Sequence, residues 1–312
     1  MSGFTFHLPP SALSEGGAKM KPFYQSLTRG LKDAGHSVSL VNHDRDAALA
    51  QIEADDGFHI FDHGQLRHAR ALNAGIAYVY PFWNLDPWGI RAFSSIAAQK
   101  FDPQAVPAQA AAEFFGRLRH RLVKKRASRY PQPPEVAQDL PRECIAIFLQ
   151  SEFHRDVGET CYLTRAEMVQ TVLEAAPDKP VVIKPHPRDL EPETYLRLHK
   201  LLSEWPNLTI SSANIHDILG AADKVVTINS AVGIEAQLHR VSVILCGHAD
   251  FFHVCHTAKT TTELTALVQQ DLAPQPVEAY LHWYFRQNCL AAGDPELVTH
   301  FLDRVAQTGF AL

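Results

Sequence analysis

Two short signatures, separated by one strand–helix–strand interval, constrain the fold of this chain more than any other feature. Residues 181–187 form an apolar run that ends in Lys-Pro-His-Pro, and residues 225–236 form a second run that passes through Asn-Ser into Gly-x-Glu-Ala. In an open α/β sheet, parallel strands end at one edge, where such folds bind phosphorylated ligands. We therefore expect both signatures at the carboxyl edge of one parallel sheet.

The pattern around the signatures predicts a Rossmann-type domain over residues 141–270. Short β-branched runs alternate with helical patterns, as parallel sheets require. The predicted strands are 145–149, 181–183, 208–210, 224–228 and 242–246, and the predicted helices are 164–176, 193–204, 215–221 and 233–238. Residues 271–312 are predicted as C-terminal helices that pack back on the first domain.

The first half has the same alternation and predicts a Rossmann-like domain over residues 1–135. Its predicted strands are 4–8, 37–41, 58–61 and 76–80, its predicted helices are 21–34, 47–55 and 65–74, and residues 81–90 are predicted as an ordered loop. The Pro-rich run at residues 131–134 removes backbone donors and marks the boundary between the domains.

Composition excludes several classes of protein. A chain of 312 residues that is 46% hydrophobic can bury two cores, and a net charge of −5 argues against nucleic acid as a partner. No apolar stretch approaches the ~20 residues of a membrane-spanning helix. The five cysteines are scattered and odd in number, which favours reduced thiols in a cytoplasmic protein.

One segment is strongly basic. Arg117–Arg129 contains seven Lys or Arg residues. A solvated helix face or linker is the favoured interpretation, and peripheral contact with an anionic inner membrane is the alternative.

The paired signatures resemble those of a known family. Lys184-Pro185-His186-Pro187 followed by Ser230-x-x-Gly233-x-Glu235 is similar to motifs of bacterial capsular polysaccharide synthesis β-Kdo transferases, which use CMP-Kdo. The resemblance covers roughly residues 145–250. It implies an α/β GT-B-like fold, with two Rossmann-type domains whose parallel sheets face a central cleft, the first on the acceptor side and the second binding the nucleotide sugar. It also implies a CMP-sugar donor, most specifically CMP-Kdo, and no cofactor or metal.

The residue types fit departure of CMP from such a donor. His186 can donate a hydrogen bond or proton to the leaving phosphate, Ser230 and nearby backbone N–H groups can hold its oxygens, and Glu235 suits the ribose hydroxyls. The simpler alternatives are a Pro-stopped turn, a helix N-cap and close helix–strand packing. The predicted nucleotide-binding residues are Lys184, His186, Pro187, Asn229, Ser230, Ala231, Gly233 and Glu235.

A second group of polar residues follows the strand at 145–149. The resemblance places a Gln and acidic residues here, which Gln150, Glu152 and Asp156 match with altered spacing. Asp156 is narrowly preferred to Glu152 as the catalytic carboxylate, and ordinary loop charges are an equal alternative. Arg155 or Arg188 could hold a sugar carboxylate through a bidentate contact.

Acceptor-side residues are predicted in the first half. His63 follows a strand and is a candidate acceptor base, although a lone His is more often structural. Trp83 and Asp86 are predicted to bind a sugar, because aromatic faces suit saccharide rings and a carboxylate suits hydroxyls. The alternative is that the rings fill a hydrophobic gap.

The leading hypothesis is therefore a glycosyltransferase that moves a Kdo-like acidic sugar from CMP to a glycan or glycolipid acceptor in surface polysaccharide synthesis. A sialyltransferase or another nucleotide-sugar transferase is the nearest alternative. A UDP-sugar 2-epimerase-like enzyme follows, because the Ser-x-x-Gly-x-Glu turn also resembles those enzymes. A non-catalytic CMP-binding capsule protein is the last.

Overall fold

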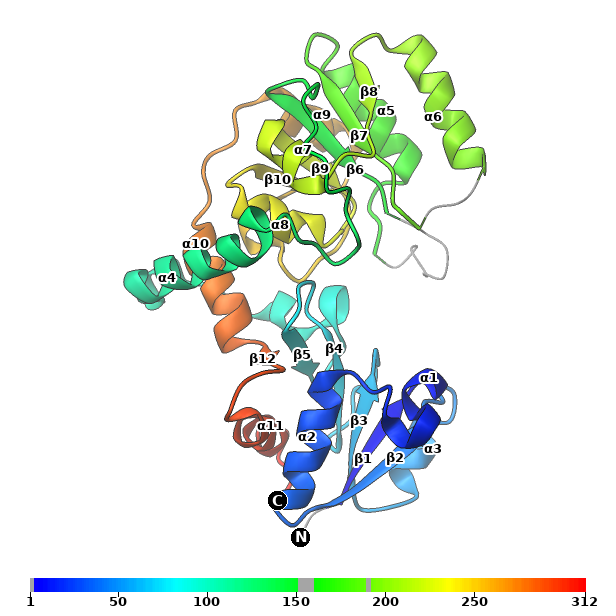
Figure 1. Ribbon diagram of the computed structural model, residues 1–312, viewed down its shortest axis with the longest axis vertical. Coiled ribbons are helices and arrows are strands. Elements are labelled where there is room, and N and C mark those ends of the chain that lie inside the picture. The colour runs from blue at the N-terminus through cyan, green and yellow to red at the C-terminus, as the bar shows by residue number, and fades with distance from the viewer. Residues whose placement is uncertain (1–2, 151–159, 189–191) are drawn as a thin grey trace. The chain divides into compact units, whose positions relative to one another are not determined.

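The chain folds into two compact α/β units, described by a computed structural model over residues 3–150, 160–188 and 192–312 (Figure 1). The first unit comprises Met1–Lys100 and Trp283–Leu312, and the second comprises Phe101–His282. No helix within the described residues combines the length and apolar character needed to cross a membrane.

The first unit is built on a six-stranded sheet of order β12-β5-β4-β3-β1-β2. Strands β1 to β4 pair in parallel, whereas β5 is antiparallel to both β4 and β12. The strands are β1 Gly3–Leu8, β2 Ser37–Asn42, β3 Phe58–Asp62, β4 Ala71–Ile76, β5 Phe82–Asp86 and β12 Leu290–Ala291. The helices are α1 Pro10–Leu13, α2 Pro22–Asp33, α3 Ala48–Glu53 and α11 Leu297–Ala306.

The core of this unit joins both ends of the sequence. Phe4 and Phe6 of β1 pack with Leu27 of α2 and with Phe301 and Val305 of α11, and all five are fully buried or nearly so. The prediction that C-terminal helices pack back on the first domain is confirmed for α11.

The secondary structure predicted for residues 65–90 is wrong. The predicted helix 65–74 and strand 76–80 are replaced by β4, and the predicted loop 81–90 contains β5. Both strands carry a buried Asn, which interrupts the apolar run that marks a strand in sequence. Asn73 donates to the Leu66 and Asp86 carbonyls, and Asn84 accepts from the Arg91 N–H, so neither amide is left unsatisfied.

The second unit has an all-parallel sheet of order β11-β10-β9-β6-β7-β8. Its strands are β6 Cys144–Phe148, β7 Val181–Lys184, β8 Leu208–Ile210, β9 Ala222–Thr227, β10 Ser242–Leu245 and β11 His256–Thr257. Its helices are α4 Ala108–Arg119, α5 Arg165–Ala175, α6 Pro192–Glu204, α7 Ile215–Ala221, α8 Val232–Leu238, α9 Thr261–Gln269 and α10 Val277–His282. Every strand from 145 to 246 was predicted within a few residues.

The division between the units differs from the predicted boundary at residue 135. Residues 101–135 and 271–282 belong to the second unit, because α4 packs beside α10 (Figure 1). Aromatic edges hold the two segments together, with Phe101 against Tyr280 at 5.1 Å and Phe114 against His282 at 5.9 Å between ring centroids.

Candidate functional site

The two signatures lie at the carboxyl edge of the second unit's sheet, on either side of β6. Strand order reverses between β6 and β9, because the chain runs outward from β6 to β8 and then returns to the other side at β9. Open α/β folds bind ligands at this kind of switch point. Neighbouring strands lie about 4.8 Å apart, so the ends of β7 and β9 are separated by roughly 10 Å.

Two side-chain amides are hydrogen-bonded across the switch point. Gln150 follows β6, Asn229 follows β9, and the Gln150 Nε2 donates to the Asn229 Oδ1 at 3.1 Å. The Asn229 Nδ2 donates in turn to the His248 carbonyl at 2.8 Å. Both side chains are buried. The structure therefore gives these residues a role in fixing the loops, and their predicted contacts with substrate and nucleotide stay predictions.

His186 lies just beyond β7, and its backbone surroundings fix its tautomer. Its Nδ1 lies 3.1 Å from the Arg188 backbone N–H, which can only donate. Nδ1 is therefore the acceptor, and in the neutral imidazole the proton resides on Nε2. The half-buried ring is thus prepared to donate a hydrogen bond from Nε2, as its predicted role requires.

Lys184 has contacts that the prediction did not include. Its buried Nζ donates to the Ser212 and Ala213 carbonyls at 3.0 and 2.6 Å, and burial lowers its pKa. Two of its three donors thus hold the loop after β8. Its neighbour in the motif, Pro187, is exposed.

The turn into α8 differs from the N-cap considered above. The N-cap residue is Ala231, and the Ser230 Oγ, one residue earlier, lies 3.4 Å from the Val232 backbone N–H at the start of the helix. A Cβ on Gly233 would lie 2.7 Å from the Phe251 ring. Gly233 therefore serves close packing of α8, which does not depend on a ligand.

Glu235 is an ionisable side chain in an unfavourable environment. Burial raises its pKa to about 7, although a hydrogen bond with Ser128 acts in the opposite direction. Among the described residues its Oε1 has no hydrogen-bond partner. A buried polar atom without a partner costs about 1–3 kcal/mol, so this oxygen is an unsatisfied acceptor.

Residues 126–137, here called the strap, run along this site and were not predicted to belong to it. Arg126 pairs with Asp217 of α7 at 2.7 Å, and the Ala127 carbonyl accepts from the His216 Nε2 at 2.9 Å. The Tyr130 ring meets His186 edge-on at 5.1 Å between centroids. The strap also brings Ser128 to Glu235. One segment therefore contacts residues of both signatures.

Part of the basic segment 117–129 is explained by the strap, because Arg126 forms a structural ion pair. Arg188, predicted to hold a sugar carboxylate, is exposed, and its guanidinium lies 4.9 Å from the Tyr130 ring centroid. The predicted residues Glu152, Arg155 and Asp156 lie outside the described residues.

In the first unit, His63 has the surroundings of a general base. It follows β3 and its Nδ1 lies 2.9 Å from the Asp62 Oδ2, while the Tyr24 hydroxyl donates to the Asp62 Oδ1 at 2.5 Å. Burial raises the pKa of Asp62, but the hydrogen bonds from His63 and Tyr24 outweigh it and hold the pKa below its usual value. A carboxylate only accepts, so the His63 proton resides on Nδ1 and Nε2 carries the lone pair.

The predicted sugar platform at Trp83 and Asp86 is wrong. Trp83 is fully buried and stacks on Phe23 of α2 at 4.4 Å between ring centroids. Asp86 is also buried, and it accepts from the backbone N–H groups of Trp88, Gly89 and Ser95. The alternative that the ring fills the core is therefore the correct one.

Comparisons with known proteins agree with this arrangement. Residues 136–288 match the model of the capsule polysaccharide biosynthesis protein family, which confirms the resemblance predicted from the two signatures. No curated protein sequence matches the chain significantly.

Two solved structures extend the likeness to the whole fold. Thermosulfurimonas dismutans KpsC, beta Kdo 2,7 transferase, is similar over 97% of this chain and 99% of that chain, with a TM-score of 0.56 and 14% identity. The beta Kdo 2,4 transferase of the same organism's KpsC is similar over 90% and 89%, with a TM-score of 0.52 and 13% identity. The predicted GT-B-like fold of two Rossmann-type units is confirmed.

Proposed function

We propose that this chain, whose residues 136–288 match the model of the capsule polysaccharide biosynthesis protein family, is a glycosyltransferase that moves a Kdo-like acidic sugar from its CMP form to a glycan or glycolipid acceptor. The observation that carries the proposal is the tautomer of His186. Its Nδ1 accepts from the Arg188 backbone N–H, so its Nε2 carries a proton beyond the carboxyl end of β7, beside the switch point. The fold shared with two structures described as beta Kdo transferases supports the choice of sugar.

The second unit supplies the donor side of the reaction. When the bond between the sugar and CMP breaks, negative charge grows on the phosphate, and the His186 Nε2–H stabilises it or transfers its proton. The Glu235 Oε1, which has no partner among the described residues, accepts a hydrogen bond from a ribose hydroxyl. The buried pair of Gln150 and Asn229 keeps the loops in place while the ligand changes.

The first unit supplies the acceptor side. The His63 Nε2 takes the proton of the attacking hydroxyl, and the Asp62 carboxylate stabilises the imidazolium that forms. The Tyr24 hydroxyl, which donates to the same carboxylate, holds that carboxylate in place.

A nucleotide panel tests the donor class. The melting temperature is measured with CMP, CDP, UMP, UDP, GDP and AMP for wild type, His186→Ala and Ser230→Ala, with His199→Ala on the exposed face of α6 as the matched control. A nucleotide at about 100 times its Kd stabilises the fold by about 2.7 kcal/mol.

We expect CMP to stabilise wild type and the control more than either site variant, and CMP-Kdo to be turned over. Preference for UDP would overturn the cytidine donor and favour the epimerase-like alternative. CMP binding without turnover, across an acceptor panel, would favour a non-catalytic binding protein.

A further inference from the structure

The first unit contains a hollow of about 380 Å³ whose lining includes none of the residues assigned to the proposed reaction. It lies where the loop between β3 and β4, the end of β5 and helix α11 come together. Leu72 and Leu85 supply an apolar part of its lining, and Gln307 and Thr308 supply polar groups. Its size is within the usual range of small-molecule sites.

The ionisable side chains that line this hollow are all basic. They are Arg67, His68 and Arg304, and none of the described residues that line the hollow is an Asp or Glu. The carboxylates of α11 and its approach, Asp294 and Asp303, line an adjoining hollow that shares Arg304 and Gln307 with this one. Asp294 is paired there with His300 at 3.5 Å. The hollow therefore attracts an anion.

Both guanidinium groups are held in place by neutral partners. The Arg67 guanidinium lies 4.2 Å from the centroid of the Trp88 ring, a cation–π contact that leaves its N–H donors available at the edge. Arg304 donates from one nitrogen to the Gln287 carbonyl at 2.7 Å. Neither contact neutralises the positive charge. Two pre-positioned guanidiniums can therefore bind an anion with little loss of side-chain entropy.

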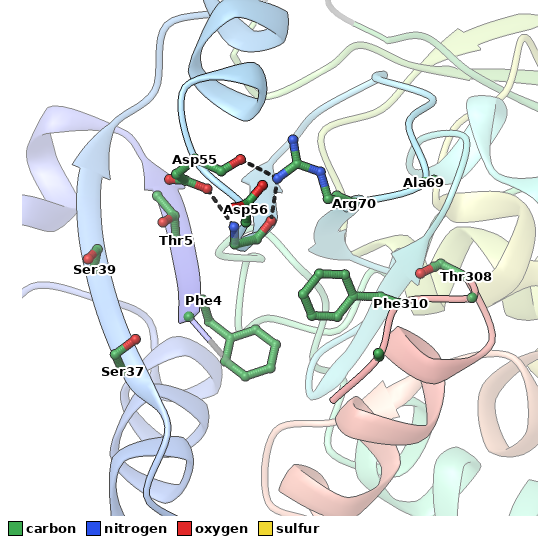
Figure 2. A pocket seen from close by; sticks show the side chains of 14 residues that line it. Phe4, Thr5, Ser37, Ser39, Asp55, Asp56, Ala69, Arg70, Thr308 and Phe310 are labelled. Atoms are coloured by element: carbon green, nitrogen blue, oxygen red, sulfur yellow. Dashed lines mark hydrogen bonds between the residues drawn. The ribbon is translucent and has the colours of Figure 1, made fainter. Parts of the chain in front are cut away.

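The neighbouring hollow has acidic side chains in its lining (Figure 2). It measures about 780 Å³, shares Ala69 and Thr308 with the first, and carries Asp55 and Asp56. Its own Arg70 donates to the backbone carbonyls of Asp55 and Gly57, as the dashed lines in Figure 2 indicate. An anionic ligand is thus repelled on one side of the shared wall and attracted on the other.

We propose that the hollow between Arg67 and Arg304 binds a carboxylate-bearing saccharide, as a second site separate from the donor site. A guanidinium matches a carboxylate in bidentate geometry, while the leucines suit the C–H face of a sugar ring and Gln307 and Thr308 suit its hydroxyls. A bare phosphate would leave the apolar lining unused. The choice of an acidic sugar rests on the proposed function, but the site itself does not.

Saturation-transfer NMR and calorimetry with free Kdo test the proposal. The methyl ester of Kdo removes the charge and keeps the ring, and inorganic phosphate keeps the charge without the ring. The variants are Arg67→Gln, Arg304→Gln and Trp88→Leu. Arg29→Gln on the exposed surface of α2 and Asp56→Asn in the neighbouring hollow are matched controls. His186→Ala reports separately on the donor site.

We expect Kdo to bind wild type and both controls equally, and each of the three site variants to weaken binding at least fivefold without a change in melting temperature. His186→Ala should bind Kdo like wild type. Binding of the ester or of phosphate as tightly as Kdo, or unchanged binding in Arg67→Gln and Arg304→Gln, would overturn the proposal, as would no binding at all. Loss of Kdo binding in His186→Ala alone would place the sugar at the donor site, which refutes the second site and leaves the proposed function intact.

Discussion

His63 in the first unit and His186 in the second follow strands of their respective sheets, yet their neighbours hold them in opposite tautomers. The Asp62 carboxylate accepts from His63 and leaves the lone pair on Nε2, whereas the Arg188 backbone N–H donates to His186 and leaves the proton on Nε2. His63 is thus prepared as a base, and His186 as a hydrogen-bond donor. The partner of Nδ1 decides the role, and the strand-end position does not.

The largest expected effect comes from removing the donor at His186. His186→Ala should lower the rate of CMP release from CMP-Kdo by about 10²–10⁴, the usual contribution of a positioned acid. His186→Gln retains an N–H and should lose less. The control is His199→Ala, and a His186→Ala enzyme with the wild-type rate would show that His186 only forms a turn.

Reversing the tautomer of His63 tests the other half of the comparison. In Asp62→Asn the side-chain amide can donate to Nδ1, which moves the proton to Nε2 and removes the base. We expect kcat to fall by about 10²–10³ with the affinity for CMP unchanged. Asp56→Asn, an exposed carboxylate of the same unit, is the control. A change in CMP affinity with an unchanged kcat would contradict a role for His63 as base.

Glu235→Gln should separate binding from stability. The native pKa of about 7 lies above the unfolded value of 4.5, so the folded state binds the proton more tightly and stability falls as pH rises from 4.5 through 7. The amide of the variant does not titrate, so the variant should be more stable than wild type at pH 8, by on the order of 3 kcal/mol.

The same variant should bind CMP roughly tenfold more weakly, about 1.4 kcal/mol, because an amide offers one acceptor where a carboxylate offers two. Urea unfolding at pH 5 and pH 8, with CMP titrations, measures both effects. Glu174→Gln on the exposed surface of α5 is the control. Equal stability of variant and wild type at pH 8 would show that Glu235 is not held in a desolvated site.

The smallest effect is expected at Tyr130, which positions His186 through its ring edge. Tyr130→Leu should lower kcat about threefold, in line with the 0.5–1.5 kcal/mol of an aromatic pair, and Tyr130→Phe should leave kcat unchanged. Steady-state rates with CMP-Kdo measure both. If Tyr130→Phe is as slow as Tyr130→Leu, the hydroxyl and not the ring supports His186.

The second unit's sheet could be predicted because its strands contain short runs of β-branched and aliphatic residues, such as Val181–Ile183 and Val225–Val226. Val181–Lys184 and Ala222–Thr227 are buried along most of their length, as parallel strands covered on both faces are. In the first unit, β4 and β5 carry buried Asn residues whose partners lie in other loops. Sequence patterns do not contain those partners, so the strands were missed and Trp83 was assigned to a binding surface.

The strap was missed for a related reason. Arg126 and Asp217 are far apart in sequence, and a basic run gives no sign that one of its members forms a partly buried ion pair. By contrast, the positions of His186 beyond β7 and of Glu235 in the first turn of α8 could be predicted, because each occupies a fixed offset from a strand end or a helix start. Their protonation could not, because it depends on the burial of Glu235 and on the turn that brings the Arg188 backbone N–H to the His186 Nδ1.

The first unit is assembled from two stretches of sequence, and this has a consequence for synthesis. Its core needs Phe301 and Val305, but the ribosome delivers the continuous segment Phe101–His282 before either residue. At about 5–20 residues per second, Phe4 and Phe6 wait roughly 15–60 seconds for α11. We expect the second unit to fold first on the nascent chain, while the first hundred residues remain an incomplete, chaperone-accessible sheet.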